Sequence, residues 1–122
     1  MNILIVDDET SSLDILSDLL GFEGHRTMTL QDPRKVLEST QSFAADVLFL
    51  DIHMPRMNGY DVFKLLQKHP DTQQLPVVFI SALDEEGNRK HIHRLGAKHF
   101  LSKPFNIADV LELVRSFAQP PS

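Results

Sequence analysis

The chain has 122 residues, 42% of them hydrophobic, no cysteine and a formal net charge of −5 at pH 7. This length predicts a single domain with one buried core, and the lack of cysteine excludes disulfides, thiolate metal sites and cysteine nucleophiles. The negative charge argues against direct contact with nucleic acid, and because no apolar run approaches the roughly 18 residues of a membrane span, we expect a cytoplasmic protein without membrane contact.

Hydrophobic patterning predicts five strands, each followed by a helix. The strands are short β-branched or continuously apolar runs, at 2–6, 25–30, 47–50, 77–80 and 98–102. Apolar residues at helical spacing predict helices over about 13–21, 33–40, 59–69, 85–95 and 107–118. The fourth helix is poor in apolar residues, with Ile92 and Leu95 as its main anchors, so we expect it to be loosely docked. Residues 1–118 are predicted to form the domain, and the proline-rich 119–122 to begin a linker or tail.

Five strand–helix units predict an α/β fold: a doubly wound parallel sheet with helices on both faces. In such a sheet the carboxyl ends of the strands share one edge, which is where open α/β sheets place their ligands. The residues expected at that edge are polar or charged, namely Asp7, Asp8, Asp51, Ser81 and Lys103.

This set of residues fits phosphoryl transfer to an aspartate. Three converging carboxylates repel one another unless a cation neutralises them, and all-oxygen ligands favour a hard ion such as Mg²⁺. Asp51, at the end of a continuously apolar strand, would attack phosphorus as a carboxylate nucleophile. Lys103 would balance charge on the phosphoryl oxygens, and Ser81 could donate a hydrogen bond to the same group.

Four motifs resemble those of the receiver domains of two-component response regulators. They are the acidic run Ile5–Glu9 (IVDDE), the loop Asp51–Gly59 (DIHMPRMNG), Ser81-Ala82, and Lys103-Pro104-Phe105. The resemblance covers almost the whole chain and is of the chemotaxis-regulator type. It implies a flavodoxin-like fold with five helices, strand order 2-1-3-4-5, and a cis bond between Lys103 and Pro104.

The resemblance also implies a role for each matching residue. Asp51 would accept the phosphoryl group, with Mg²⁺, or Mn²⁺ in its place, held by Asp8, Asp51 and the backbone carbonyl of His53, and by Asp7 directly or through water. Ser81 and Phe100 would form the switch pair. His53 and Leu83 occupy the positions that tune phosphoryl lifetime in this family, and the role of the His53 imidazole is left open between positioning water, shielding phosphorus and binding a softer metal.

The implied partner is a sensor histidine kinase or a histidine phosphotransfer protein. The surface of the fourth helix, fifth strand and fifth helix would relay the phosphorylated state to an output domain or partner, in some cases by forming a homodimer. The domain would be a phosphoacceptor regulator and not an enzyme, assisting only its own phosphorylation and dephosphorylation.

Three other functions fit parts of the pattern. A flavodoxin-like cofactor-binding domain has the same sheet, but Asp7, Asp8 and Glu9 would repel a cofactor phosphate. An aspartate-nucleophile phosphatase would use the same nucleophile but would turn over a phosphomonoester. An unphosphorylated receiver could act as an interaction module, although the complete acidic set argues against it. His91 and His93 point apart on a helix, so solvated side chains are expected there and not a metal site.

Overall fold

The structure is a computed structural model that describes residues 1–81 and 86–118. The described residues form five strands and five α-helices that alternate along the chain: β1 (Asn2–Val6), α1 (Thr10–Phe22), β2 (Arg26–Leu30), α2 (Val36–Phe43), β3 (Val47–Asp51), α3 (Gly59–Gln67), β4 (Val77–Ser81), α4 (Glu86–Arg94), β5 (His99–Ser102) and α5 (Ile107–Ala118). A 3₁₀ turn at Pro33–Lys35 leads into α2. Each predicted strand and helix is therefore present.

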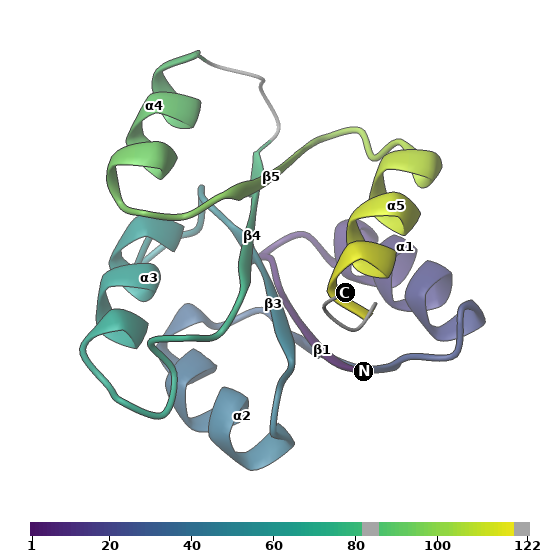
Figure 1. Ribbon diagram of the computed structural model, residues 1–122, viewed down its shortest axis with the longest axis horizontal. Helices are drawn as coiled ribbons and strands as arrows, with labels where there is room; N and C mark the ends of the chain where they lie inside the picture. Colours follow the sequence, from purple (N-terminus) through teal and green to yellow (C-terminus); the bar gives the residue numbers. More distant parts are fainter. Residues whose placement is uncertain (82–85, 119–122) are drawn as a thin grey trace.

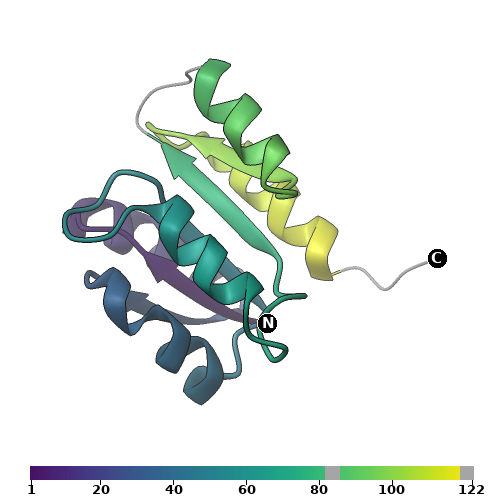
Figure 2. The same cartoon turned by 90° about the vertical axis from the view of Figure 1, so that its left-hand side faces the viewer.

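The strands form one parallel sheet in the order β2-β1-β3-β4-β5. Helices α1 and α5 cover one face, and α2, α3 and α4 cover the other, as the two views in Figure 1 and Figure 2 show. This arrangement confirms the predicted doubly wound fold. Every residue of β3 is buried, which explains why this strand is continuously apolar up to Asp51.

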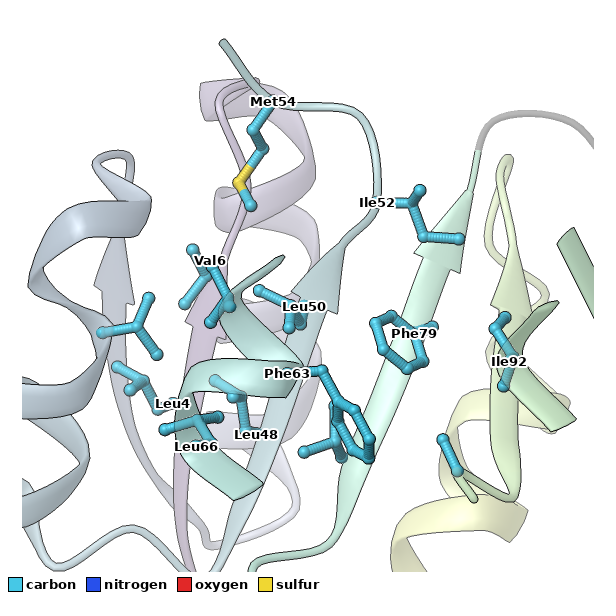
Figure 3. Packing of buried hydrophobic residues seen from close by; sticks show 14 residues of the cluster. Leu4, Val6, Leu48, Leu50, Ile52, Met54, Phe63, Leu66, Phe79 and Ile92 are labelled. Atoms are coloured by element: carbon cyan, nitrogen blue, oxygen red, sulfur yellow. The ribbon is translucent and has the colours of Figure 1, made fainter. Parts of the chain in front are cut away.

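Side chains alternate between two hydrophobic clusters, one on each face of the sheet. Leu4 and Val6 of β1 point toward α2, α3 and α4, where they join Leu48, Leu50, Phe63, Leu66 and Phe79 (Figure 3). Ile3 and Ile5, which alternate with them along β1, point toward α1 and α5. Burying each such side chain contributes roughly 1.5–3 kcal/mol, so the two clusters together fix the positions of the strand ends that carry the polar residues.

Helix ends differ by a few residues from the sequence prediction. The helix predicted over 33–40 continues to Phe43, because the chain leaves it only at Ala44, which adopts a left-handed conformation with φ 52°. The helix predicted over 59–69 stops at Gln67. Asn106 caps the last helix as expected, with its side-chain oxygen accepting a hydrogen bond from the Asp109 N–H at 3.2 Å.

The contacts of helix α4 with the rest of the domain include a buried side chain, Ile92, and ring contacts of His91 and Arg89. Ile92 is buried beside Phe79 in the cluster of Figure 3, and Leu95 is half-buried. The His91 ring stacks on Tyr60 of α3 with centroids 4.0 Å apart and planes 7° apart. The Arg89 guanidinium lies 5.5 Å from the centre of the Phe100 ring of β5. Loose docking of α4 stays a prediction, but its apolar anchor is the expected one.

Within residues 1–81 and 86–118, no helix has the length and apolar content needed to cross a membrane.

Candidate functional site

The predicted polar residues meet at the carboxyl edge of the sheet. Asp7 directly follows β1, Asp51 and Ser81 are the last residues of β3 and β4, and Lys103 directly follows β5. Asp7 and Ser81 are fully buried and Asp51 is 3% exposed, whereas Asp8 is exposed. The structure therefore places two carboxylates inside the protein and a third at the surface beside them.

Burial and the neighbouring carboxylate of Asp7 raise the pKa of Asp51 to about 7. Lys103 acts in the opposite direction, and so does the backbone N–H of His53, which lies 3.4 Å from Asp51 Oδ1. Burial is the largest cause, because desolvation disfavours the charged form of an acid. Asp51 must be ionised to act as a nucleophile, so the site requires additional positive charge close to its carboxylate.

Lys103 supplies part of that positive charge, but its ammonium group does not lie equally close to the three carboxylates around it. Its ammonium Nζ lies 2.8 Å from Asp7 Oδ2, 3.1 Å from Glu9 Oε1 and 3.7 Å from Asp51 Oδ2. Burial lowers the pKa of Lys103, but the surrounding carboxylates more than offset this and leave the pKa above its ordinary value. Lys103 is therefore protonated and is bound more closely to Asp7 and Glu9 than to Asp51.

The three aspartates can hold a hard divalent cation. Asp7, Asp8 and Asp51 each offer a carboxylate oxygen, and these oxygens lie within 4.8 Å of one another. Oδ2 of Asp7 is buried and receives no well-aligned hydrogen bond from the described residues, although Lys103 Nζ is close. A buried carboxylate oxygen is costly to leave unsatisfied, and Mg²⁺ prefers such oxygens together with water. The donor set thus fits Mg²⁺.

The loop after β3 approaches the backbone of Asp51 closely at Gly59. The N–H of Gly59 donates to the Ile52 carbonyl at 2.9 Å, which closes the loop that begins at Asp51. A Cβ on Gly59 would lie 2.5 Å from the Asp51 carbonyl oxygen and 2.9 Å from Ile52 Cα. Only glycine allows this approach, so residue 59 helps to set the backbone that carries Asp51. The His53 side chain is exposed at the rim of this loop.

The remaining predicted residues lie on the side of the site toward β4 and β5. Ser81 is buried, and its carbonyl accepts a hydrogen bond of 2.7 Å from the Lys103 N–H. Phe100 is half-buried on β5 in register with Phe79. The Lys103-Pro104 bond is cis, as the resemblance implied. Leu83, predicted to tune phosphoryl lifetime, lies outside the described residues.

Two residues of the site carried no predicted role. Glu9 pairs with Lys103, and Gly59 contacts the backbone of Asp51. Glu9 stands next to the two predicted metal ligands, so the third acid of the run was the available signal. The contact of Gly59 has no sequence signal beyond its place at the end of the loop, because it depends on how the loop folds back.

Comparison with known proteins agrees with this geometry. Residues 3–115 match the model of the response regulator receiver domain. The chain is 34% identical over 114 residues to the transcriptional regulatory protein CpxR of Escherichia coli, a match that covers 93% of this chain and 47% of CpxR. It thus spans about half of CpxR's length.

Solved structures show the same fold. Chemotaxis protein CheY4 of Vibrio cholerae superposes with a TM-score of 0.87 at 26% identity, covering 95% of this chain and 97% of CheY4. The receiver domain of sensor histidine kinase PA1611 from Pseudomonas aeruginosa has a TM-score of 0.85 at 21% identity, with 95% of each chain covered. That structure is described with a magnesium ion coordinated in its active-site cleft.

Proposed function

Because the chain belongs to the response regulator receiver domain family, which accepts phosphoryl groups in two-component signalling, we propose that Asp51 is its phosphoacceptor. The observation that carries this proposal is the placement of Asp51, buried at the end of β3 and facing two further aspartates and Lys103. Binding of a flavodoxin-type cofactor is not favoured, because these carboxylates would repel the negatively charged phosphate ester of such a cofactor.

The donor is a phosphohistidine of a sensor histidine kinase or of a histidine phosphotransfer protein. A carboxylate oxygen of Asp51 forms a bond to phosphorus, the bond from phosphorus to the donor imidazole nitrogen breaks, and that nitrogen keeps the electron pair. Lys103 is placed to stabilise negative charge on the transferring group. Bound Mg²⁺, or Mn²⁺ in its place, supplies further positive charge to the phosphoryl oxygens. The residues that would hold it are Asp7, Asp8, Asp51 and the His53 carbonyl.

Phosphorylation adds about −1.5 to −2 charges at this edge of the sheet. Ser81, buried at the end of the neighbouring strand β4, is the proposed donor of a hydrogen bond to the new group, and Phe100 is the proposed partner that changes rotamer with it. The exposed side chain of His53 and Leu83 are the proposed tuning positions. The proposed domain covers residues 1–118 and acts as a regulator without turnover of its own; residues 119–122, predicted to begin a linker or tail, lie outside the described residues.

The proposed output surface is formed by α4, β5 and α5. It contains a groove of about 440 Å³ between Arg89 and Phe100 on one side and Asp109 and Glu112 of α5 on the other. Exposed Arg89, Lys90 and Arg94 make α4 basic, whereas exposed Asp109 and Glu112 make the nearby turn of α5 acidic. Opposite charges on neighbouring helices support a two-fold homodimer in which each α4 faces the partner's α5. The absence of nucleic-acid contact and the cytoplasmic location stay predictions.

The test is to incubate the protein with acetyl phosphate and Mg²⁺ and to measure its intact mass. We expect one phosphate adduct, which disappears when Mg²⁺ is chelated and in the variant Asp51→Asn. The matched control is Asp14→Asn, which removes an exposed carboxylate from α1 and should leave the adduct unchanged. An undiminished adduct on Asp51→Asn would reject Asp51 as the acceptor.

A further inference from the structure

The ammonium of Lys103 lies closer to Asp7 and to Glu9, which has no assigned role, than to Asp51. Its distances to Asp7 Oδ2 and Glu9 Oε1 are 2.8 and 3.1 Å, both within hydrogen-bonding range, whereas Asp51 Oδ2 is 3.7 Å away. We propose that Glu9 is a positioning residue that holds Lys103 away from Asp51 until the phosphoryl group arrives, and then releases it. This inference rests on the proposed function of Asp51.

Within the part of the chain that the structure describes, the one polar contact of the Glu9 side chain is its ion pair with Lys103. It is the N-cap residue of α1, yet its side chain makes no capping hydrogen bond to the helix. Its backbone N–H is bound by Asp7 Oδ1 at 2.9 Å, which fixes the main chain beside the site. The carboxylate instead reaches Lys103, which lies 94 residues further along the chain. The contact with Lys103 is thus its distinguishing interaction.

The two acids bound to Lys103 differ in how easily their contacts with it can be broken. The Asp7 side chain is fully buried, so breaking its contact would leave an unpaired charge inside the protein. The Glu9 side chain is 57% exposed, and water can replace its partner. Exposed ion pairs contribute about 0–1 kcal/mol. The Glu9–Lys103 ion pair is therefore the weaker of the two, and it is the one that Lys103 can exchange for another partner.

The side chain of Lys103 can change partners without moving its backbone. Its N–H is bound to the Ser81 carbonyl at 2.7 Å, which anchors the residue at the end of β4. An ammonium has three donors, so Lys103 can keep Asp7 while it transfers another donor from Glu9 to a phosphoryl oxygen. The doubly charged phosphoryl group on Asp51 is the stronger acceptor. Glu9 thus opposes the approach of Lys103 in the resting state only.

If Glu9 competes for Lys103, removing its charge should speed phosphorylation. In Glu9→Gln we expect the rate of adduct formation from acetyl phosphate and Mg²⁺ to rise by about two- to fivefold, where fivefold corresponds to about 1 kcal/mol. The increase should vanish in the Lys103→Met background. Asp14→Asn controls for the loss of one negative charge near an anionic donor, and Glu9→Asp, which keeps the charge, should stay nearer to the wild type than Glu9→Gln.

A second readout follows the ammonium itself in the resting protein. The ¹⁵N and ¹H signals of Lys103 Nζ should shift in Glu9→Gln toward their values in wild-type protein saturated with Mg²⁺ and beryllofluoride, a phosphoryl analogue. Asp14→Asn should not produce this shift. A backbone amide spectrum like that of the wild type, away from residues 7–10 and 103, shows that the variant is folded.

The outcomes separate this inference from the proposed function. Failure of the wild type to form an adduct rejects the phosphoacceptor role, while the resting Lys103 signal still reports on Glu9. A wild type that is phosphorylated, with Glu9→Gln unchanged, slower, or equally fast with Asp14→Asn, overturns the role of Glu9. The same holds if the acceleration persists without Lys103, or if the Lys103 signal does not move.

Discussion

Replacing Asp51 with asparagine is expected to stabilise the protein at neutral pH without Mg²⁺. Burial and Asp7 raise the pKa of Asp51 from 3.8 to about 7 in the folded protein. The folded state therefore binds a proton more tightly than the unfolded state, and the stability linked to that proton is present below pH 3.8 and is lost as the pH rises to about 7. Asparagine has the shape of the protonated acid and avoids this loss.

The size of the effect follows from the shift. About three pH units at roughly 1.4 kcal/mol per unit give a loss of about 4 kcal/mol at pH 7.5 and of about 1 kcal/mol at pH 4.5. Urea unfolding at both values should show that Asp51→Asn exceeds the wild type by several kcal/mol at the higher pH and by far less at the lower. Equal stabilities, or a difference that does not depend on pH, would refute the claim that burial and Asp7 disfavour the ionised form of Asp51.

Three further substitutions probe other contacts of the site and of α4. Gly59→Ala should destabilise the protein by about 1–3 kcal/mol and slow phosphorylation, because its Cβ would meet the Asp51 carbonyl at 2.5 Å. His91→Ala should remove the stack on Tyr60 and cost about 0.5–1.5 kcal/mol, with faster hydrogen exchange in α4. Asp8→Asn should reduce the rise in unfolding midpoint that Mg²⁺ produces, because an ion that binds more weakly stabilises the folded state less at the same concentration.

The glycine variant and the histidine variant each have a matched control in the same chain. Gly21→Ala lies in α1 with no atom within 4 Å of the new Cβ, so it should stabilise by about 0.5–1 kcal/mol instead of destabilising. His93→Ala removes an exposed imidazole from the same helix as His91 and should leave hydrogen exchange in α4 unchanged. Equal effects of both glycine variants, or of both histidine variants, would contradict the contacts described, as would an Mg²⁺ response of Asp8→Asn equal to that of the wild type.

The sequence predicted the fold and most of the site because both follow from local patterns. The continuous apolar run from Val47 to Leu50 predicts a strand buried on both faces, and parallel strands bring their carboxyl ends to one edge. That rule, together with the strand order that the resemblance implied, places Asp51 near Asp7 and Lys103, whose contacts the structure contains.

Contacts that depend on how closely separate segments approach each other in the folded chain could not be predicted from local sequence patterns. The contact of Glu9 with Lys103 was not predicted, because an acid at the start of a helix also interacts favourably with the helix dipole and its place in the acidic run does not reveal a distant partner. The Gly59 contact depends on how closely the loop returns to Asp51. The stack of His91 on Tyr60 depends on how closely α3 and α4 approach each other.

The measurement that tests the central claim most directly is to locate the modified residue. After incubation with acetyl phosphate and Mg²⁺, borohydride reduces an aspartyl phosphate to homoserine, and peptide mass spectrometry identifies the position. We predict homoserine at position 51, with none at positions 7 or 8. Homoserine at another aspartate, with position 51 unchanged, would contradict the proposal that Asp51 is the phosphoacceptor.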